Sequence, residues 1–395
     1  MAGLQIYAPR ERRLVAAADA VLSPLGWFRK RPATSASVTR VLLLRLERIG
    51  DLLMTLDAIA AARTAWPGAT IDLAVGSWNR DLAQLIPGIG TVITIDVPWL
   101  AREGTGDRWS ALVARAREWR GRYDVVVNFE PDIRSNFLVW LTGAPRRAGY
   151  WTGGGGSFLS DALEFEPASH VSDNSLRLIR AAAGGSALAT SSPPTTPVRL
   201  DVPADARARA AALLGGARRP IVGVHVSGGR ESKQWHLDRF AEVSQRLARE
   251  RSATIVLTGA AADRPMVDLV RSHLTDVPVI DVAGALDLVT LAGLLTQLDL
   301  LVTGDTGPMH LASAVGTPIV ALFGPADPRR YGPRSPSQRI LRVDLPCSPC
   351  GQVRLPPERC RGHVPDCMDG IQVDVVLAAV RELLDNRTGV AQTGA

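Results

Sequence analysis

Residues 302–333 read VTGDTGPMHLASAVGTPIVALFGPADPRRYGP, in which apolar runs alternate with short polar turns. The apolar run at 298–302 predicts a buried strand, and the turn at 304–308 predicts a helix start, because proline suits the first helical position. A second strand at 317–323 leads into another polar turn. Since the carboxyl ends of parallel strands meet at one edge of a sheet, where ligands bind in open α/β folds, both turns are expected to border one site.

The helix that begins in this stretch is expected to face an anion. The N–H groups of a first helical turn have no partner inside the helix, and the helix dipole adds positive potential there. Both properties favour a phosphate group. The residues predicted to form this donor site are Asp305, Thr306, Gly307, Pro308, Met309 and His310. For His310 a packed, hydrogen-bonded histidine fits equally well, and Asp305 fits a residue that orders the turn, binds a sugar hydroxyl or holds a metal.

The rest of the chain repeats this alternation of strands and helices. With 395 residues, 46% of them hydrophobic, it is long enough for two α/β domains with separate cores. Strand-like runs fall at 41–46, 70–75, 91–97 and 123–129, and again at 220–226, 253–258, 277–282, 298–302 and 317–323. The predicted organisation is an extension at 1–40, a first domain at 41–190, a linker at 191–205, a second domain at 206–372 and a helix with a tail at 373–395. Packing of this last helix back on the first domain is one predicted arrangement.

The charge and composition of the chain limit the kinds of molecule that it is expected to bind. The formal charge of +6 and the pI of about 9.6 suit an anionic substrate or membrane surface. No arginine-rich stripe with interleaved aromatic residues occurs, so no nucleic-acid partner is predicted. No apolar run is long enough to cross a bilayer. Residues 10–31 place basic flanks around a short apolar segment, which predicts either an interfacial helix on anionic lipid or a helix packed on the first domain.

The first strand leads into RLERIGD at residues 45–51. This loop holds a single glycine where a dinucleotide-binding loop needs three, which argues against a nicotinamide dehydrogenase. Asp51 stands at the corner between strand and helix. An aspartate there is suited to act as a general base, and it is equally suited to cap the helix. The spacing alone leaves both interpretations open.

The first strand of the second domain leads into SGGRESKQW at residues 227–235. Lys233 is one of only two lysines in the chain, the other being Lys30. A lysine ammonium is a compact charge that can neutralise a departing diphosphate, and glycine backbone can approach phosphate oxygens closely. Lys233 is therefore a candidate catalytic residue, with Ser227, Gly228, Gly229 and Trp235 as donor-binding residues. A solvated surface lysine is the alternative.

The pattern DTGxxHLAxAxGTPxVxLFGPxDP, read from Asp305 onward, resembles the signature of glycosyltransferase family 9, the bacterial heptosyltransferases. The resemblance implies a GT-B fold, in which two Rossmann-like domains with parallel sheets face a central cleft. It also implies an inverting transfer of a heptose-like sugar, from ADP-heptose, to a lipopolysaccharide-core or other glycolipid acceptor. The implied location is cytoplasmic, peripheral on the inner face of the cytoplasmic membrane.

The resemblance also implies roles for single residues. Asp51 matches the aspartate of the family's IGD element, the proposed general base, and Lys233 and Trp235 match its KxW element. Ala326 stands where the family commonly has a hydroxyl residue. The loop at 259–263 lacks the glutamate that often contacts the ribose, which leaves Asp263 as the substitute. A noncatalytic sugar-nucleotide-binding or assembly protein on the same fold, and a nucleotide-sugar epimerase, are the alternative functions.

The four cysteines lie together near the end of the second domain, within an insert at 345–368. They are Cys347, Cys350, Cys360 and Cys367. A CxxC pair with two further thiols fits a structural zinc site, two disulfides or packed free thiols, and the spacing does not choose among them. No cofactor is required for the predicted transfer, although Mg²⁺ at the diphosphate stays open.

Features of the first domain point to an acceptor. Arg48, Arg134 and Arg147 are basic residues where an anionic acceptor could dock, with solvated surface arginines as the alternative. The run of glycines at 153–156 follows no predicted strand and is interpreted as a mobile loop beside the acceptor.

Overall fold

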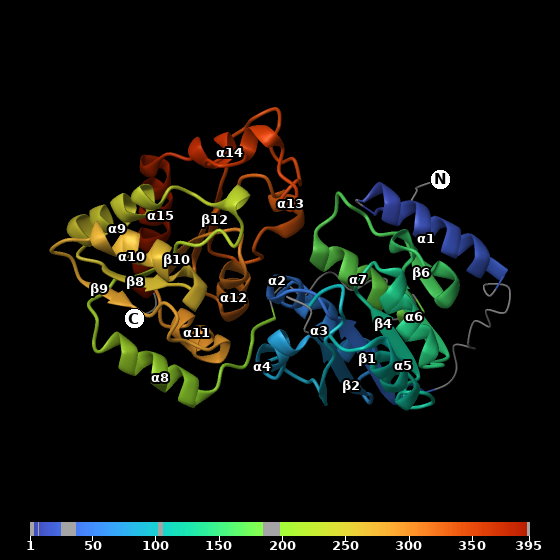
Figure 1. Cartoon of the computed structure of the whole chain (residues 1–395). Helices are drawn as coiled ribbons and strands as arrows, with labels where there is room; N and C mark the ends of the chain where they lie inside the picture. The colour runs from blue at the N-terminus through green and yellow to red at the C-terminus, as the bar shows by residue number, and fades with distance from the viewer. Residues whose placement is uncertain (1–3, 7, 25–36, 102–105, 185–197, 393–395) are drawn as a thin grey trace. The chain divides into compact units, whose positions relative to one another are not determined.

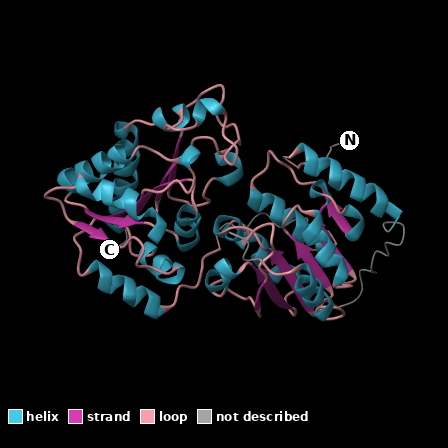
Figure 2. Ribbon diagram, viewed as in Figure 1, coloured by secondary structure: helices cyan, strands magenta, loops and turns pink. Residues whose placement is uncertain are grey.

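The computed structural model describes residues 4–6, 8–24, 37–101, 106–184 and 198–392, and it divides into two compact units, Met1–Val198 and Arg199–Ala395. Each unit is a parallel six-stranded sheet with helices packed on its faces (Figure 1; Figure 2).

The sheet of the first unit has the order β3-β2-β1-β4-β5-β6. Five of the six residues of β1 are buried, because a central parallel strand is covered by helices on both faces. In register, Val41 pairs with Ile71 on one side and with Val125 on the other. The strands are β1 (Arg40–Arg45), β2 (Thr70–Val75), β3 (Val92–Thr94), β4 (Val125–Asn128), β5 (Arg146–Tyr150) and β6 (Asp161–Leu163).

The helices of the first unit follow these strands in sequence, as a repeated βαβ pattern requires. They are α1 (Pro9–Leu22), α2 (Ile49–Leu53), α3 (Leu56–Ala65), α4 (Arg80–Ala83), α5 (Trp109–Glu118), α6 (Ile133–Leu141) and α7 (Val171–Ala182), with short 3₁₀ turns η2 (Ser77–Asn79), η3 (Trp151–Gly153) and η4 (Gly156–Phe158). Helix α1 realises the short amphipathic element expected near the N-terminus, whereas residues 25–36 lie outside the described part of the chain.

The sheet of the second unit has the order β12-β11-β10-β7-β8-β9. Its central strands are buried along their whole length. The strands are β7 (Ile221–His225), β8 (Thr254–Thr258), β9 (Val279–Asp281), β10 (Leu300–Gly304), β11 (Ile319–Leu322) and β12 (Gln338–Leu341). The strand runs expected from the sequence in both domains are confirmed, but β5, β6 and β12 were not anticipated.

The second unit holds more helices than the first among the described residues. They are α8 (Ala204–Leu214), α9 (Leu237–Arg251), α10 (Arg264–Ser272), α11 (Leu288–Leu295), α12 (Gly307–Val315), α13 (Pro328–Tyr331), α14 (Asp366–Asp369) and α15 (Val373–Gln392), with η5 (Glu231–Lys233), η6 (Ala261–Asp263) and η7 (Glu358–Cys360). Helix α12 begins where the proline-containing turn predicted it. Among the described residues, no helix is long and apolar enough to cross a bilayer.

The last helix belongs to the core of the second unit. Helix α15 packs on α9 and on strands β10, β11 and β12, and its residues Val376, Leu377 and Val380 are fully buried in that core. Its apolar face is therefore used within the second unit. The second unit also begins inside the predicted linker, because the Leu200 N–H donates to the Ala314 carbonyl at 3.1 Å. Residues 185–197 of that linker lie outside the described ranges.

Both sheets share one topological feature. The first strand of each unit lies in the middle of its sheet, with β1 between β2 and β4, and β7 between β8 and β10. The chain winds outward from this strand first in one direction and then in the other. The loops after β1 and β4 therefore diverge in the first unit, and the loops after β7 and β10 diverge in the second. The carboxyl edge of the sheet between two such loops is its switch point, which is where open α/β sheets bind ligands.

Candidate active site

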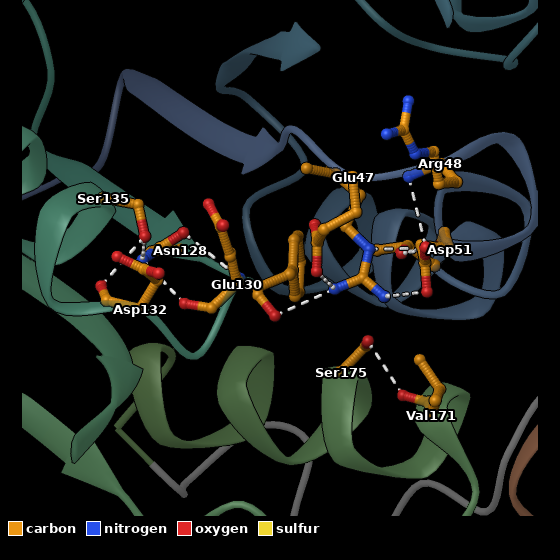
Figure 3. Close-up of polar contacts among 12 residues, drawn as sticks. Glu47, Arg48, Asp51, Asn128, Glu130, Asp132, Ser135, Val171 and Ser175 are labelled. Atoms are coloured by element: carbon orange, nitrogen blue, oxygen red, sulfur yellow. Dashed lines mark hydrogen bonds and ion pairs between the residues drawn. The ribbon is translucent and has the colours of Figure 1, made fainter. Parts of the chain in front are cut away.

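In the first unit, a buried arginine at the end of β1 connects the loops at the switch point. Arg45 is 3% exposed. Its Nη1 donates to the Phe129 carbonyl beyond β4 at 2.8 Å, and its Nε donates to the Asp51 carbonyl at 3.0 Å. Burial opposes ionisation of this guanidinium, but the carboxylates of Glu47 and Asp51 raise its pKa above the usual value. Arg45 thus joins the two loops of the switch point (Figure 3).

Asp51 lies in the first turn of α2, and its two oxygens face different groups. Oδ2 accepts from the Arg48 backbone N–H at 3.1 Å, and Oδ1 lies 3.7 Å from Arg45 Nη2. The side chain remains 31% exposed. Helix capping, one of the two interpretations of this residue, is therefore observed. It engages one oxygen, so Asp51 also retains an accessible acceptor for a proton.

Two glutamates that the sequence pattern does not single out flank Arg45: Glu130 is buried, and Glu47 has 17% of its side chain exposed. Glu47 Oε1 accepts from Arg45 at 3.1 Å, and Glu130 Oε1 accepts from the Trp99 indole N–H at 2.9 Å. The Oε2 atoms of both have no hydrogen-bond partner among the described residues. Burial raises the pKa of Glu47 to about 7, and burial together with the nearby Glu47 charge raises the pKa of Glu130 well above its usual range. A polar residue directly after a buried strand was the available signal for Glu130.

A polar network behind Glu130 fixes the loop after β4. The Asn128 amide donates to the Glu130 carbonyl at 2.9 Å and to the Ser135 hydroxyl at 2.9 Å, and Asp132 caps α6 by accepting from the Arg134 backbone N–H at 2.7 Å. Figure 3 shows Asn128, Asp132 and Ser135 to one side of Glu130, with Glu47 and Asp51 on the other side. Below them lies helix α7, where Ser175 donates to the Val171 carbonyl. These contacts hold the loop after β4 in place.

The three arginines predicted to bind an acceptor occupy different environments. The Arg134 side chain binds Asp132 through two nitrogens and lies 4.6 Å from the centre of the Trp99 ring, still partly exposed. The Arg48 guanidinium stacks on the Trp78 ring. Arg147 lies near the start of β5, away from the carboxyl edge, and donates to the carbonyls of Phe158 and Ala144. Arg147 is therefore a structural residue here, and only Arg48 and Arg134 remain near the loops of the switch point.

In the second unit, Lys233 and Asp305 meet between β7 and β10. Lys233 Nζ donates to the Asp305 carbonyl and lies 3.1 Å from Asp305 Oδ2. Both side chains are largely buried, with 17% and 13% of their surface exposed. An ammonium group has three N–H donors, so this arrangement leaves one for a ligand oxygen. The alternative of a solvated surface lysine is wrong, because the side chain is fixed across the switch point.

The loop at 227–235 needs both of its glycines. A Cβ on Gly228 would lie 2.7 Å from the Lys233 backbone, and Gly229 adopts a positive φ of 67°. The Gly228 N–H donates to Gln234 Oε1 at 2.8 Å, and the Gly229 N–H donates to the Ser227 hydroxyl at 3.2 Å. These contacts hold the loop in one shape, with Lys233 at its far end.

The other predicted donor residues divide into accessible and buried groups. Asp305, Thr306, Gly307 and Pro308 are partly exposed around the start of α12, whereas Met309 and His310 are buried. Trp235 is 1% exposed, stacks edge-on against Phe240 and donates its indole N–H to the Ile371 carbonyl at 3.0 Å. Trp235 and Met309 thus act in this structure as core residues that support the loop and the helix start.

Two further polar residues are His225, the last residue of β7, and Asp263, in the turn after β8. Asp263 Oδ2 accepts from the Ala260 N–H at 2.8 Å and so caps its own turn. His225, which no sequence motif marks, is buried with Nδ1 3.1 Å from the Thr258 hydroxyl. Burial lowers the pKa of His225 to about 4, so it is neutral at physiological pH.

The four cysteines line one small cavity of about 30 Å³, together with Ser232 of the Lys233 loop. The insert packs on that loop, because the Ser232 hydroxyl donates to the Val353 carbonyl and the Gly362 N–H donates to Glu231. All four thiols are free. Within the described ranges, no three His, Cys, Asp or Glu side chains are grouped so as to hold a metal ion, and zinc remains a prediction.

The two doubly wound units, each with a parallel six-stranded sheet, have the GT-B fold. The family model "Glycosyltransferase family 9 (heptosyltransferase)" matches residues 113–357, and the chain belongs to this family. Lipooligosaccharide heptosyltransferase 2 of Haemophilus influenzae is 25% identical over 77% of this chain and 88% of its own length. Lipopolysaccharide heptosyltransferase 1 of Pseudomonas aeruginosa is 26% identical over 79% of this chain and 86% of its own length.

Solved structures agree with the assigned fold. The Escherichia coli ADP-heptose lipopolysaccharide heptosyltransferase II superposes with a TM-score of 0.73 at 19% identity, over 89% of this chain and all of that one. A family 9 glycosyltransferase of Veillonella parvula superposes with a TM-score of 0.74 at 23% identity, over 90% of this chain and all of that one. The family assignment and the GT-B fold predicted from the signature are therefore confirmed.

Proposed function

We propose that this glycosyltransferase moves a heptose from ADP-heptose to a hydroxyl of an anionic lipopolysaccharide-core acceptor, with inversion at the anomeric carbon. The observation that carries the proposal is the Lys233–Asp305 pair at the start of α12, because it places a cation and free helix N–H groups at one ligand-binding edge. A diphosphate leaving group needs both features.

The chemistry divides between the units. Asp51 takes the proton of the acceptor hydroxyl as the oxygen attacks the anomeric carbon, and the bond from that carbon to the diphosphate oxygen breaks on the opposite face. The electron pair leaves with ADP, whose growing negative charge Lys233 and the first turn of α12 stabilise. Asp51 is suited to its part because its exposed carboxylate is oriented from behind by Arg45 and Arg48.

The choice of donor and acceptor is supported by the relatives. The Escherichia coli heptosyltransferase WaaC has been solved with ADP-2-deoxy-2-fluoro heptose, and its TM-score to this chain is 0.63. The Haemophilus influenzae and Pseudomonas aeruginosa relatives are named for lipooligosaccharide and lipopolysaccharide. Such an acceptor is anchored in a membrane, which supports action at the cytoplasmic face of the inner membrane. Arg48 and Arg134 are the arginines best placed to meet its anionic groups.

The experiment pairs donor binding with transfer. Calorimetric titration with ADP-, UDP- and GDP-activated heptose measures nucleotide preference, and mass spectrometry of a lipopolysaccharide-core acceptor measures transfer. We expect tight binding of the ADP sugar and a mass gain of one heptose on the acceptor. Binding without any transfer would instead support a noncatalytic sugar-nucleotide-binding protein, and an altered sugar released without acceptor would support an epimerase.

A further inference from the structure

An apolar groove lies on the first unit where the end of α1 meets α5, α6 and η4. Its volume is about 440 Å³, and it is lined by Leu22, Trp109, Ile133, Arg134, Phe137, Trp140 and Phe158. The Trp140 ring packs on Phe137 and Phe158, with ring centres 5.9 and 5.7 Å apart. Trp109 and Trp140 nevertheless remain 44% and 38% exposed. Two large aromatic side chains thus lie partly exposed at the surface.

Helix α1 adds a second apolar strip beside this groove. Leu14 and Val21 are 73% and 78% exposed, and a separation of seven residues places them on one face of the helix. The neighbouring face docks on the protein, because Val15 is buried and Asp19 accepts from the Gly155 N–H at 2.6 Å. The docking is close, since a Cβ on Gly154 would lie 2.3 Å from Val15. Helix α1 therefore packs on the glycine run at 153–156, and Leu14 and Val21 face away from the protein.

Cations border this apolar surface. Arg10, Arg12 and Arg13 are exposed in the first turns of α1, and no ion pair to them occurs within the described ranges. Arg108 is exposed immediately before Trp109. Exposed tryptophan and leucine beside unpaired arginine suit the boundary between anionic headgroups and acyl chains, where tryptophan is enriched and arginine meets lipid phosphate. A protein partner would need matching carboxylates, whereas an anionic bilayer supplies such charges at any orientation.

The same surface is continuous with the candidate acceptor site. Trp109 stacks on Trp99 with ring centres 5.4 Å apart, and the Trp99 indole N–H donates to Glu130 at 2.9 Å. Glu130 follows β4 at the switch point that also holds Arg45 and Asp51. A glycolipid whose acyl chains stay in a bilayer at the groove would thus present its sugars toward these carboxylates.

We propose that α1 and the α5–α6 groove form a docking surface for a bilayer containing anionic phospholipid. This inference rests on the proposed glycolipid acceptor and deepens it by assigning the membrane-facing surface. Leu14, Val21, Trp109 and Trp140 enter the headgroup boundary, while Arg10, Arg12 and Arg13 bind lipid phosphates.

The test measures sedimentation of the full chain with vesicles of phosphatidylcholine, with and without phosphatidylglycerol. We expect binding only to the anionic vesicles. The variant Leu14→Glu/Val21→Glu should weaken binding by at least about tenfold, since it removes two apolar contacts with lipid. The matched control Leu269→Glu/Val375→Glu changes two exposed apolar residues of the second unit, 47% and 51% exposed, and should bind like the unmodified protein.

A second variant tests the charge contribution. Arg12→Ala/Arg13→Ala should weaken binding on the order of tenfold at low salt and less at high salt. Arg218→Ala/Arg249→Ala, which removes two cations from the second unit, is the control for net charge. Equal binding to both kinds of vesicle would overturn the proposal, as would unchanged binding of the Leu14→Glu/Val21→Glu variant.

Transfer to a deacylated, water-soluble acceptor separates this inference from the proposed function. The Leu14→Glu/Val21→Glu variant should keep the full rate on the deacylated acceptor and lose rate on the same acceptor in anionic vesicles. If neither the unmodified protein nor the variant transfers heptose to either acceptor, the proposed function is wrong. The sedimentation measurements with vesicles still test the docking surface in that case. Loss of both rates together would contradict a purely membrane-docking role for the two residues.

Discussion

Glu47 is a largely buried carboxyl whose protonation should be visible in stability. Burial raises its pKa to about 7 from the ordinary 4.5. Between these values the folded protein holds a proton that the unfolded chain has released, so Glu47 makes the free energy of unfolding fall as pH rises from about 4.5 to 7. Glu47→Gln removes this titration, and urea unfolding across that pH range should show a shallower fall than in the unmodified protein.

The control for this effect is Glu118→Gln, which changes an exposed glutamate of α5 in the same unit. It should leave the pH dependence as it was. Glu130 still contributes a fall of the same sign after Glu47 is replaced, because its pKa is also raised. An unchanged slope in Glu47→Gln would mean that Glu47 does not titrate between these pH values.

In the proposed mechanism, Lys233 stabilises the leaving diphosphate. Lys233→Met keeps the length of the side chain and removes its charge, so kcat should fall by about 10² to 10³, as for the loss of one preorganised donor. Arg230→Met, an exposed cation in the same loop, is the matched control and should change kcat little. Steady-state kinetics with saturating donor make the comparison, and equal kcat in both variants would remove Lys233 from the mechanism.

Chemical labelling can show whether the four cysteines of the insert are free thiols or zinc ligands. Cys347 and Cys350 are exposed, whereas Cys367 is buried and burial raises its pKa to about 11. In a free-thiol protein, Cys347 and Cys350 should react quickly with a disulfide reagent and Cys367 slowly, because the thiolate is the reactive form. A chelator should not change this order.

The contrary result is equally clear for this insert. Protection of all four thiols, with zinc released as they react and with faster reaction after chelation, would contradict the free-thiol state and support the zinc prediction. Metal analysis of the purified protein provides the independent measurement. Activity retained in the chelator would also show that transfer needs no Mg²⁺.

At the level of elements, the sequence predicts what local pattern determines. The start of α12 follows from Pro308 in a polar turn, and β1 and β7 follow from continuous apolar runs. Edge strands such as β6 and β12 are only partly buried and carry polar residues, so their pattern is weak. The glycine run at 153–156 looked like a mobile loop because its partner, α1, is distant in sequence.

The candidate site shows the same division. Asp51 and Asp305 are predicted site residues because each follows an apolar strand, and Lys233 is one because it is a rare lysine in the loop after β7. Glu47 and Glu130 were missed, because their significance depends on burial around Arg45, which joins loops more than eighty residues apart. Trp235 was assigned to the donor from its place in a motif, but the fold turns its ring into the core.

On the scale of the whole molecule, the two units have separate cores, and the proposed mechanism gives them separate chemical tasks. A ligand that binds only the folded second unit should stabilise that unit. Hydrogen exchange with saturating ADP should therefore show protection at 227–235 and at the start of α12, with no protection of the loop around Asp51. Protection confined to residues 45–53 would mean that the nucleotide binds the first unit, which would contradict the proposed donor site.

The most direct test of the central claim is the transfer rate of Asp51→Asn, measured with the affinity for ADP-heptose in the same protein. Asparagine can still cap α2 through its amide oxygen, so the fold should persist. We predict a loss of about 10² to 10⁴ in kcat with donor affinity unchanged, while the exposed control Asp81→Asn keeps full activity. Full transferase activity in Asp51→Asn would contradict the assignment of this aspartate as the general base.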